Sequence, residues 1–141
     1  MITVKKQFLT DELMTRVTNI LSTNENDLKN LTKEIKHSYS LAFPQNHWTF
    51  DPLTFKVSFY SFRPGTDMKW HFDNTVLGSI IYLNKEWDIN DGGLFMYKLD
   101  NGQILAEVPE YNKMLLDYGN CEHAVSTTKK RLDTLLVFGE K

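Results

Sequence analysis

The segment Trp70-His71-Phe72-Asp73-Asn74 places a histidine and an aspartate two residues apart within a strand-like stretch. Residues i and i+2 of a β-strand point to the same face of a sheet, so His71 and Asp73 can offer an imidazole nitrogen and a carboxylate oxygen to one point in space. His123, further along the chain, is the best candidate for a third ligand. Two histidines and one carboxylate form the facial triad that holds non-haem Fe(II) and leaves coordination positions open. A His-x-Asp tripeptide is common by chance, so the segment alone leaves a metal site and an ordinary polar strand as alternatives.

The residues on either side of this segment predict many short strands. Apolar and polar residues alternate from Phe55 to Tyr60, the period-2 pattern of a half-buried strand. The tripeptide Asp100-Asn101-Gly102 separates two further strand-like runs and predicts a hairpin. The expected strands after the first cover Met68–Asp73, Gly78–Leu83, Leu94–Leu99, Gln103–Val108, Met114–Leu116, Glu122–Val125 and Leu132–Phe138. This pattern favours a closed or double-sheet β fold, such as a jelly roll, with helices packed outside.

The N-terminal part predicts a short strand over Ile2–Phe8 and then two helices. Thr10 or Asp11 is expected to cap the first helix, whose apolar stripe consists of Leu13, Met14, Val17, Ile20 and Leu21. A weaker, more polar helix is expected to run to about His37, and Ala42–His47 is expected to be a loop. We therefore predict one domain over 1–141, with a helical part at about 1–40 and a β core at about 54–138.

The composition excludes several classes of protein. The chain has 141 residues, 41% of them hydrophobic, and a formal net charge of −2. Such a balance gives no electrostatic reason to expect nucleic acid or a membrane surface as a partner. Cys121 is the only cysteine, which indicates a reducing compartment, and the first residues lack the apolar run of a signal peptide. We expect a cytoplasmic protein.

The other histidines and one arginine complete the set of polar candidates. His37 and His47 lie in polar surroundings and are interpreted as surface residues. Arg131 begins the last expected strand, and a planar guanidinium can grip a small carboxylate through two hydrogen bonds. By spacing alone, an inward anion-binding role and an ordinary surface position are equally open for Arg131.

Several motifs in order resemble the prolyl-hydroxylase branch of the 2-oxoglutarate, Fe(II)-dependent dioxygenases. The pattern Phe62-x-x-Gly65-Thr66-x-Met68-x-x-His71-x-Asp73 is similar to the metal-binding strand of that family. The runs Ile81-Tyr82-Leu83-Asn84-Lys85-Glu86-Trp87 and Asp91-Gly92-Gly93-Leu94 resemble its Y-L-N-x-x-W and G-G segments, and His123-Ala124-Val125 with Arg131 resembles its distal histidine and arginine. The likeness covers about Phe55 to Phe138. It implies a double-stranded β-helix, the cupin-like jelly roll.

The resemblance also implies roles for individual residues. His71, Asp73 and His123 would bind Fe(II), and Arg131 would pair with the distal carboxylate of 2-oxoglutarate, with Tyr82 donating its hydroxyl to the same group. O2 would be the second co-substrate, and ascorbate a further cofactor. The implied reaction is hydroxylation of a C–H bond with release of succinate and CO2, with a prolyl residue of a peptide or protein as the expected substrate.

The chain departs from the family pattern at two places near the expected co-substrate. Phe62 stands where many relatives have a tyrosine, and Tyr60 lies on the same strand face to replace its hydroxyl. The interval from His123 to Arg131 is shorter than in many relatives, and an inward Arg131 would bring Asp133 inward too. If Lys130 points inward instead, Leu132, Thr134, Leu136 and Phe138 line the interior, so Lys130 remains an alternative partner for the carboxylate.

The substrate and the activity have alternatives as well. The loop from Asn74 to Gly78 and the segment Phe43–Pro52, with Trp48 and Phe50, are expected to shape the entrance. The same chemistry on a free amino acid, a small metabolite or a modified base is the first alternative to prolyl hydroxylation. A non-catalytic metal-binding β-barrel module is the second. The short chain suits a minimal bacterial or viral member of the family.

Overall fold

The computed structural model describes residues 2–23, 25–118 and 121–141. The helices are α1 (Asp11–Thr23), α2 (Thr32–Ala42) and α3 (His47–Phe50), and 3-10 turns cover Glu25–Leu31, Pro44–Asn46 and Ile89–Asp91. The strands are β1 (Ile2–Lys5), β2 (Thr54–Phe62), β3 (Met68–His71), β4 (Leu77–Tyr82), β5 (Phe95–Lys98), β6 (Ile104–Glu107), β7 (Met114–Asp117), β8 (His123–Val125) and β9 (Leu132–Glu140). Among the described helices, none is long and apolar enough to cross a membrane.

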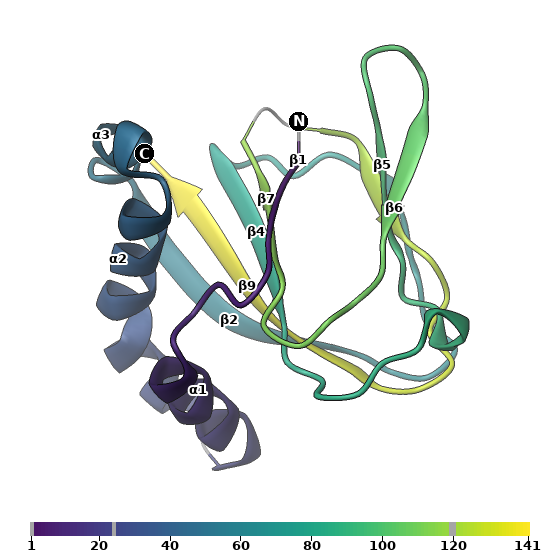
Figure 1. Ribbon diagram of the computed structural model, residues 1–141, viewed down its shortest axis with the longest axis horizontal. Helices are drawn as coiled ribbons and strands as arrows, with labels where there is room; N and C mark the ends of the chain where they lie inside the picture. Colours follow the sequence, from purple (N-terminus) through teal and green to yellow (C-terminus); the bar gives the residue numbers. More distant parts are fainter. Residues whose placement is uncertain (1, 24, 119–120) are drawn as a thin grey trace.

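The strands form two antiparallel sheets that face each other (Figure 1). The larger sheet has the order β1-β7-β4-β9-β2 and the smaller one the order β3-β8-β5-β6. The expected hairpin joins β5 to β6, and Gly102 adopts the positive φ of 86° that its turn requires. The prediction of a mainly β jelly roll with flanking helices is confirmed.

The larger sheet is buried on both faces, which creates two separate apolar cores. On β7, Met114 and Leu116 face the helices, whereas Leu115 faces the smaller sheet. The same alternation on β9 turns Leu135 toward the helices and Leu132 toward the smaller sheet. The cavity described below lies between the sheets, on the side away from the helices.

The helices cover the outer face of the larger sheet (Figure 1). The hydroxyl of Thr10 accepts a hydrogen bond from the backbone N–H of Leu13 at 3.2 Å, so the expected cap of α1 forms. Leu28 and Leu31 are buried like the stripe of α1, because the chain enters α2 through a 3-10 turn that packs on the same core.

The segment expected to be a loop before the sheet differs from the prediction. The helix α2 continues to Ala42, and a 3-10 turn and α3 follow at once. Phe50 is fully buried, packing edge-on against Tyr39 and Phe55 in the helix-side core. This aromatic side chain therefore fills the core instead of shaping an entrance, and the side chain of Trp48 is outside the described part of the chain.

Candidate metal centre

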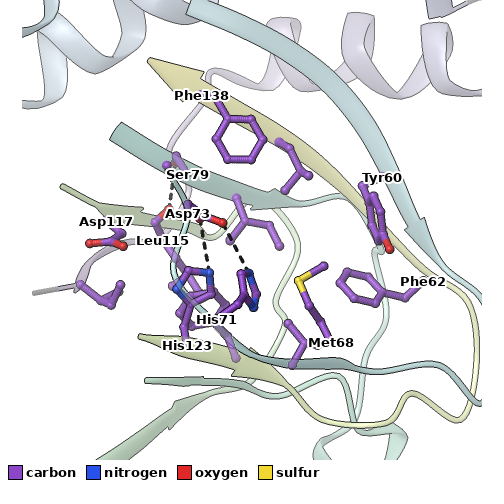
Figure 2. A pocket seen from close by; sticks show the side chains of 16 residues that line it. Tyr60, Phe62, Met68, His71, Asp73, Ser79, Leu115, Asp117, His123 and Phe138 are labelled. Atoms are coloured by element: carbon purple, nitrogen blue, oxygen red, sulfur yellow. Dashed lines mark hydrogen bonds and ion pairs between the residues drawn. The ribbon is translucent and has the colours of Figure 1, made fainter. Parts of the chain in front are cut away.

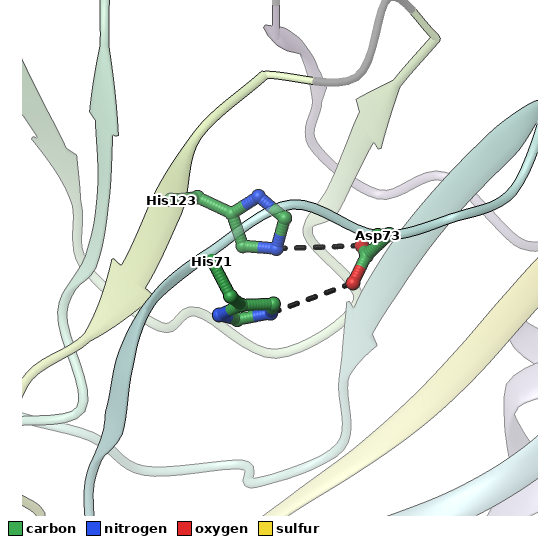
Figure 3. Close-up of side chains that lie close together, drawn as sticks. All are labelled: His71, Asp73 and His123. Carbon is green, nitrogen blue, oxygen red and sulfur yellow. Dashed lines mark ion pairs between the residues drawn. The ribbon is translucent and has the colours of Figure 1, made fainter.

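The backbone pairing of β3 with β8 brings the two histidines together. His71 and His123 are direct cross-strand partners, and their ring centroids lie 4.4 Å apart. Asp73 lies two residues after His71, just beyond the end of β3, and its carboxylate reaches both rings (Figure 3). The arrangement that the His-x-Asp spacing predicts is therefore completed by a residue distant in sequence.

An irregularity in β3 turns His71 toward the interior. The register between β3 and β8 shifts between Met68 and His71. Residues three apart on a regular strand point to opposite faces, yet both side chains line the same cavity. The shift adds one residue to β3 relative to β8, and Met68 and His71 can therefore both face the cavity.

The ligand atoms converge on one small volume. The Nε2 atom of His71 lies 3.4 Å from Oδ1 of Asp73, and Nε2 of His123 lies 3.3 Å from Oδ2. One nitrogen or oxygen from each of the three residues lies within 4.8 Å of the other two, so a single metal ion can bind all three.

Backbone carbonyls orient both rings. The Nδ1–H of His71 donates to the carbonyl of Lys69 at 2.6 Å, and that of His123 donates to the carbonyl of Cys121 at 2.7 Å. Each neutral imidazole then directs the Nε2 lone pair at the Asp73 carboxylate. Two lone pairs and an anion repel one another unless a proton or a cation lies between them. Such carbonyl contacts are the outer shell typical of metal-binding histidines.

The charges in the site are coupled. The hydrogen bond from His123 lowers the pKa of the Asp73 carboxyl, and the positive charge of a protonated imidazole lowers it further. Burial by itself would lower the pKa of the His123 imidazole, but its contacts with Asp73 and the Cys121 carbonyl raise it above its ordinary value. The site thus favours positive charge beside an ionised carboxylate, which suits a divalent cation.

A small cavity of about 150 Å³ opens beside these three candidate ligands. Figure 2 shows His71, Asp73 and His123 at one end and Tyr60, Phe62 and Met68 toward the other. The full lining consists of the three ligands with Ile2, Tyr60, Phe62, Met68, Gly78, Ser79, Ile80, Phe95, Leu115, Asp117, Val125, Leu136 and Phe138. Apart from the ligands and Asp117, this wall is almost entirely apolar.

Two residues that the sequence analysis did not single out support the ligands. A Cβ on Gly78 would lie 3.0 Å from Oδ2 of Asp73, so the missing side chain makes room for the carboxylate. The ring of Phe95 stacks on His123 with centroids 5.0 Å apart and fixes the plane of that imidazole. A glycine inside an apolar strand is the signal that could have indicated such a close approach.

Asp117 is a further acidic side chain in the cavity wall. Its Oδ2 accepts the backbone N–H of Cys121 at 2.9 Å, whereas Oδ1 is buried without a hydrogen-bond partner among the described residues. Burial raises the pKa of the Asp117 carboxyl despite the Cys121 N–H. Cys121 itself is buried and forms no disulfide.

Arg131 lies outside the cavity, contrary to the expectation of an inward guanidinium. Its side chain is largely exposed, and its Nε donates to Oδ1 of Asp133 at 2.8 Å. The parity of β9 explains the position of Asp133, because Leu136 and Phe138 face the cavity and the alternating register turns Asp133 the other way. Arg131, just before the strand, lies on the side of Asp133, with which it pairs.

Lys130, the alternative partner for a carboxylate, is also held elsewhere. Its Nζ lies 3.0 Å from Oδ2 of Asp91 and 5.2 Å from the centre of the Trp87 ring. Although the even-numbered residues of β9 point inward, Lys130 precedes the strand and does not follow its register. Neither expected cation lines the cavity.

The two tyrosines take different positions. Tyr60 lines the cavity next to Phe62, with ring centroids 4.8 Å apart. Tyr82 is buried in the core between the sheets with Leu132 and does not line the cavity. Burial, reinforced by the charge of Glu107, raises the pKa of the Tyr82 phenol.

The residues present fit an iron ion and only one end of 2-oxoglutarate. Two imidazoles and a carboxylate are the donors that non-haem Fe(II) takes, and all three side chains line the cavity. A 2-oxo acid could chelate such a metal through its carboxylate and keto oxygens. Among the described residues of the lining, however, no lysine or arginine is present to pair with a second carboxylate.

The chain resembles known proteins in its three-dimensional structure. No protein-family model and no curated protein sequence matches the chain. A prolyl-4-hydroxylase from Pseudomonas putida superposes with a TM-score of 0.79 over 99% of this chain and 92% of that one, at 17% sequence identity. The chain has the fold of the prolyl hydroxylases.

Two further solved structures support this similarity. A prolyl hydroxylase from Trichoplax adhaerens, in complex with a hypoxia inducible factor oxygen degradation domain peptide fragment, matches with a TM-score of 0.76 at 12% identity, over 99% of this chain and 83% of that one. The viral collagen prolyl hydroxylase from Paramecium Bursaria Chlorella virus-1, as a 2OG complex, matches with a TM-score of 0.73 at 12% identity, over 98% and 94% of the two chains. The jelly roll predicted from the sequence is thus a fold that the chain shares with all three of these prolyl hydroxylases.

Proposed function

We propose that the chain is a non-haem Fe(II) oxygenase that uses a 2-oxo acid and O2 to hydroxylate a C–H bond. The observation that carries the proposal is the convergence of His71, Asp73 and His123 at the end of an apolar cavity. The proposed ligands are the Nε2 atoms of both histidines and the carboxylate of Asp73. Bound iron would supply the redox chemistry and the open positions for the 2-oxo acid and O2.

The protein's own residues would hold and shield that centre. The carbonyls of Lys69 and Cys121 keep both imidazoles in the tautomer that binds metal through Nε2. Phe95 and Gly78 fix the positions of His123 and Asp73, as described above. The apolar wall would limit the access of water to the reacting centre.

A prolyl residue of a peptide or protein is the substrate that we propose first. The fold is that of prolyl hydroxylases, one of which was solved with a bound peptide fragment. Phe72 and Val76, both exposed and within three residues of Asp73 in the sequence, offer apolar surface on which a pyrrolidine ring could pack. A free amino acid, a small metabolite or a modified base remains the alternative substrate class.

The 2-oxo acid that the resemblance implies is 2-oxoglutarate, with ascorbate as a reductant that keeps the iron in the ferrous state. The chelating half of 2-oxoglutarate suits the three ligands. Its distal carboxylate would need a partner other than Arg131 and Lys130 as the structure places them. We therefore propose a 2-oxo acid, as a chemical class, for the co-substrate.

The first experiment measures iron binding and turnover separately. Anaerobic Fe(II) should bind with a stoichiometry of about one, and addition of a 2-oxo acid should produce the visible charge-transfer band of the chelate. His71→Ala should abolish both, whereas His37→Ala, a histidine on α2 away from the cavity, should leave both unchanged. Absence of iron binding by the wild-type protein would refute the proposal.

The second experiment identifies the oxidised product. Wild-type protein with Fe(II), ascorbate, O2 and a 2-oxo acid should add about 16 Da to proline in a peptide library, as read by mass spectrometry. Oxidation confined to another residue or to a small molecule would replace the prolyl assignment. Iron binding without any consumption of O2 across these substrates would favour a non-catalytic metal-binding module.

A further inference from the structure

Among the described residues, the cavity wall beyond the three metal-binding candidates offers a second carboxylate no lysine or arginine as a partner. Its charged groups other than the histidine ligands are Asp73 and Asp117, both acidic. Asp117 is only 6% exposed, and one of its oxygens has no partner among the described residues. Protonated or ionised, Asp117 supplies no positive charge to an incoming anion, and an uncompensated carboxylate is costly to bury.

The inward face of β9 is equally unsuited to a dicarboxylate. The inward-facing residues are Leu132, Thr134, Leu136 and Phe138. The hydroxyl of Thr134 donates to the carbonyl of Tyr60 at 2.8 Å and is therefore already used in the sheet. No side chain on this face can form an ion pair.

The one buried lysine among the described residues is also engaged. Lys113, the residue before β7, is 6% exposed, and its Nζ lies 3.0 Å from Oε1 of Glu107 and 2.9 Å from the carbonyl of Val108. It does not line the cavity. Turning it inward would leave the half-buried Glu107 carboxylate without its partner.

We propose that the cavity selects a 2-oxo acid with a short, uncharged, apolar side chain, in preference to 2-oxoglutarate. This inference rests on the proposed function, because the metal would hold the carboxylate and keto oxygens of either acid. The side chain would then lie against Phe62, Met68 and Leu136, where each buried methylene is worth about fourfold in affinity. A branched acid such as 4-methyl-2-oxopentanoate has the required shape and carries no second charge.

The overall reaction with such an acid is balanced. The 2-oxo acid loses its carboxyl carbon as CO2, and its keto carbon becomes the carboxyl of an acid one carbon shorter. One oxygen atom of O2 enters that carboxyl, and the other enters the C–H bond of the substrate as a hydroxyl. For 4-methyl-2-oxopentanoate the co-product is 3-methylbutanoate, where 2-oxoglutarate would give succinate.

Anaerobic titration of the Fe(II)-loaded protein tests the selection. The charge-transfer band of the chelate would be followed as 2-oxoglutarate or 4-methyl-2-oxopentanoate is added. We expect the branched acid to bind at least tenfold more tightly. Equal or tighter binding of 2-oxoglutarate would overturn this inference and leave the proposed function intact, whereas no band with either acid would refute both.

Two variants locate the cause of the selectivity. Leu136→Arg places a guanidinium on the inward face of β9 and should shift the ratio of the two dissociation constants toward 2-oxoglutarate by at least tenfold. Arg131→Gln should leave that ratio within twofold of the wild-type value. A selective loss of 2-oxoglutarate binding in Arg131→Gln would show that this arginine reaches the ligand and would overturn the inference. If Leu136→Arg does not fold, as judged by circular dichroism, the effect of Arg131→Gln on the ratio of the two dissociation constants still tests the inference.

Discussion

The absence of a side chain at Gly78 makes room for the Asp73 carboxylate of the proposed metal site. Any residue could adopt the backbone conformation of Gly78, which does not have a positive φ. A Cβ at this position, however, would lie 3.0 Å from the Asp73 Oδ2 atom. Gly78→Ala should displace the carboxylate and weaken metal binding by about 10- to 100-fold, the range typical of changes next to a ligand. A competition titration with a metal-sensitive dye measures this affinity.

Gly139→Ala is the matched control for that substitution. Its Cβ would meet Leu53 and Leu77 at 3.1 and 3.2 Å, equally tight contacts on the helix side of the sheet. We expect Gly139→Ala to lower stability and leave metal affinity unchanged. An equal loss of affinity in both variants would mean that general unfolding, not the position of Asp73, is the cause.

The buried carboxyl of Asp117 should make the free energy of unfolding of the metal-free protein depend on pH. Because burial raises the pKa of this carboxyl above its ordinary value of 3.8, the folded protein holds the proton more tightly than the unfolded chain. Stability contributed by the protonated form is then lost as pH rises through the folded pKa. Asp117→Asn keeps an acceptor for the Cys121 N–H and removes the charge.

The variant should therefore be more stable than wild type at neutral pH. This advantage should shrink as pH falls toward the ordinary pKa of an aspartate, where both proteins are uncharged at this position. Urea unfolding in EDTA at several pH values measures the difference. An advantage that does not change with pH would contradict the role assigned to the buried charge.

At the scale of elements, the strands and the first helix could be predicted because their patterns are local. The period-2 alternation of β2 and the Asp100-Asn101-Gly102 turn appear in the structure where the sequence placed them. The register shift in β3 could not be predicted, since it depends on the pairing with β8. Likewise, the His-x-Asp pair could be recognised in the sequence. The space that Gly78 leaves for the Asp73 carboxylate could not, because Gly78 lies on a different strand, β4.

The direction of Arg131 could not be read from β9 for a physical reason. The strand is buried on one face by the helices and on the other by the smaller sheet, so both sets of alternating residues are largely apolar. Leu135 and Val137 form one set, and Leu132 and Leu136 belong to the other. The hydrophobic pattern therefore does not reveal which set shares a face with Arg131.

A buried hydrogen bond between α2 and β4 should contribute to the stability of the fold. Tyr39 is fully buried, and its hydroxyl donates to Oγ of Ser79 at 2.7 Å, while Ser79 donates to the carbonyl of Leu115 at 2.8 Å. Tyr39→Phe keeps the ring contacts with Phe8 and Phe55. It should lower the free energy of unfolding by about 1–2 kcal/mol, because one buried hydrogen bond is lost.

A double-mutant cycle with Ser79→Ala separates this bond from other effects. Since the Tyr39→Phe and Ser79→Ala substitutions remove the same interaction, the double variant should be less destabilised than the sum of the single variants. Urea unfolding measures all four proteins. Strictly additive effects would show that the hydroxyl pair does not couple α2 to the sheet.

For the whole molecule, the two cores separate folding from metal binding. The helix-side core involves α1, α2 and the outer face of the larger sheet, and it contains none of the three ligands. The fold should therefore persist without metal, and bound metal should add stability through mass action alone. At a free metal concentration of 100 times the Kd, this addition is about 2.7 kcal/mol.

Removal of the metal tests that separation. With EDTA, the wild-type protein should keep its far-ultraviolet circular dichroism and melt at a lower temperature, and Mn(II), as a redox-stable substitute, should restore the Tm in a concentration-dependent way. Asp73→Ala should fold and show no such increase, because two neutral imidazoles hold a divalent ion weakly without the carboxylate. Loss of secondary structure in EDTA would contradict this expectation, since it would make the metal part of the folding core instead of a ligand of an already folded jelly roll.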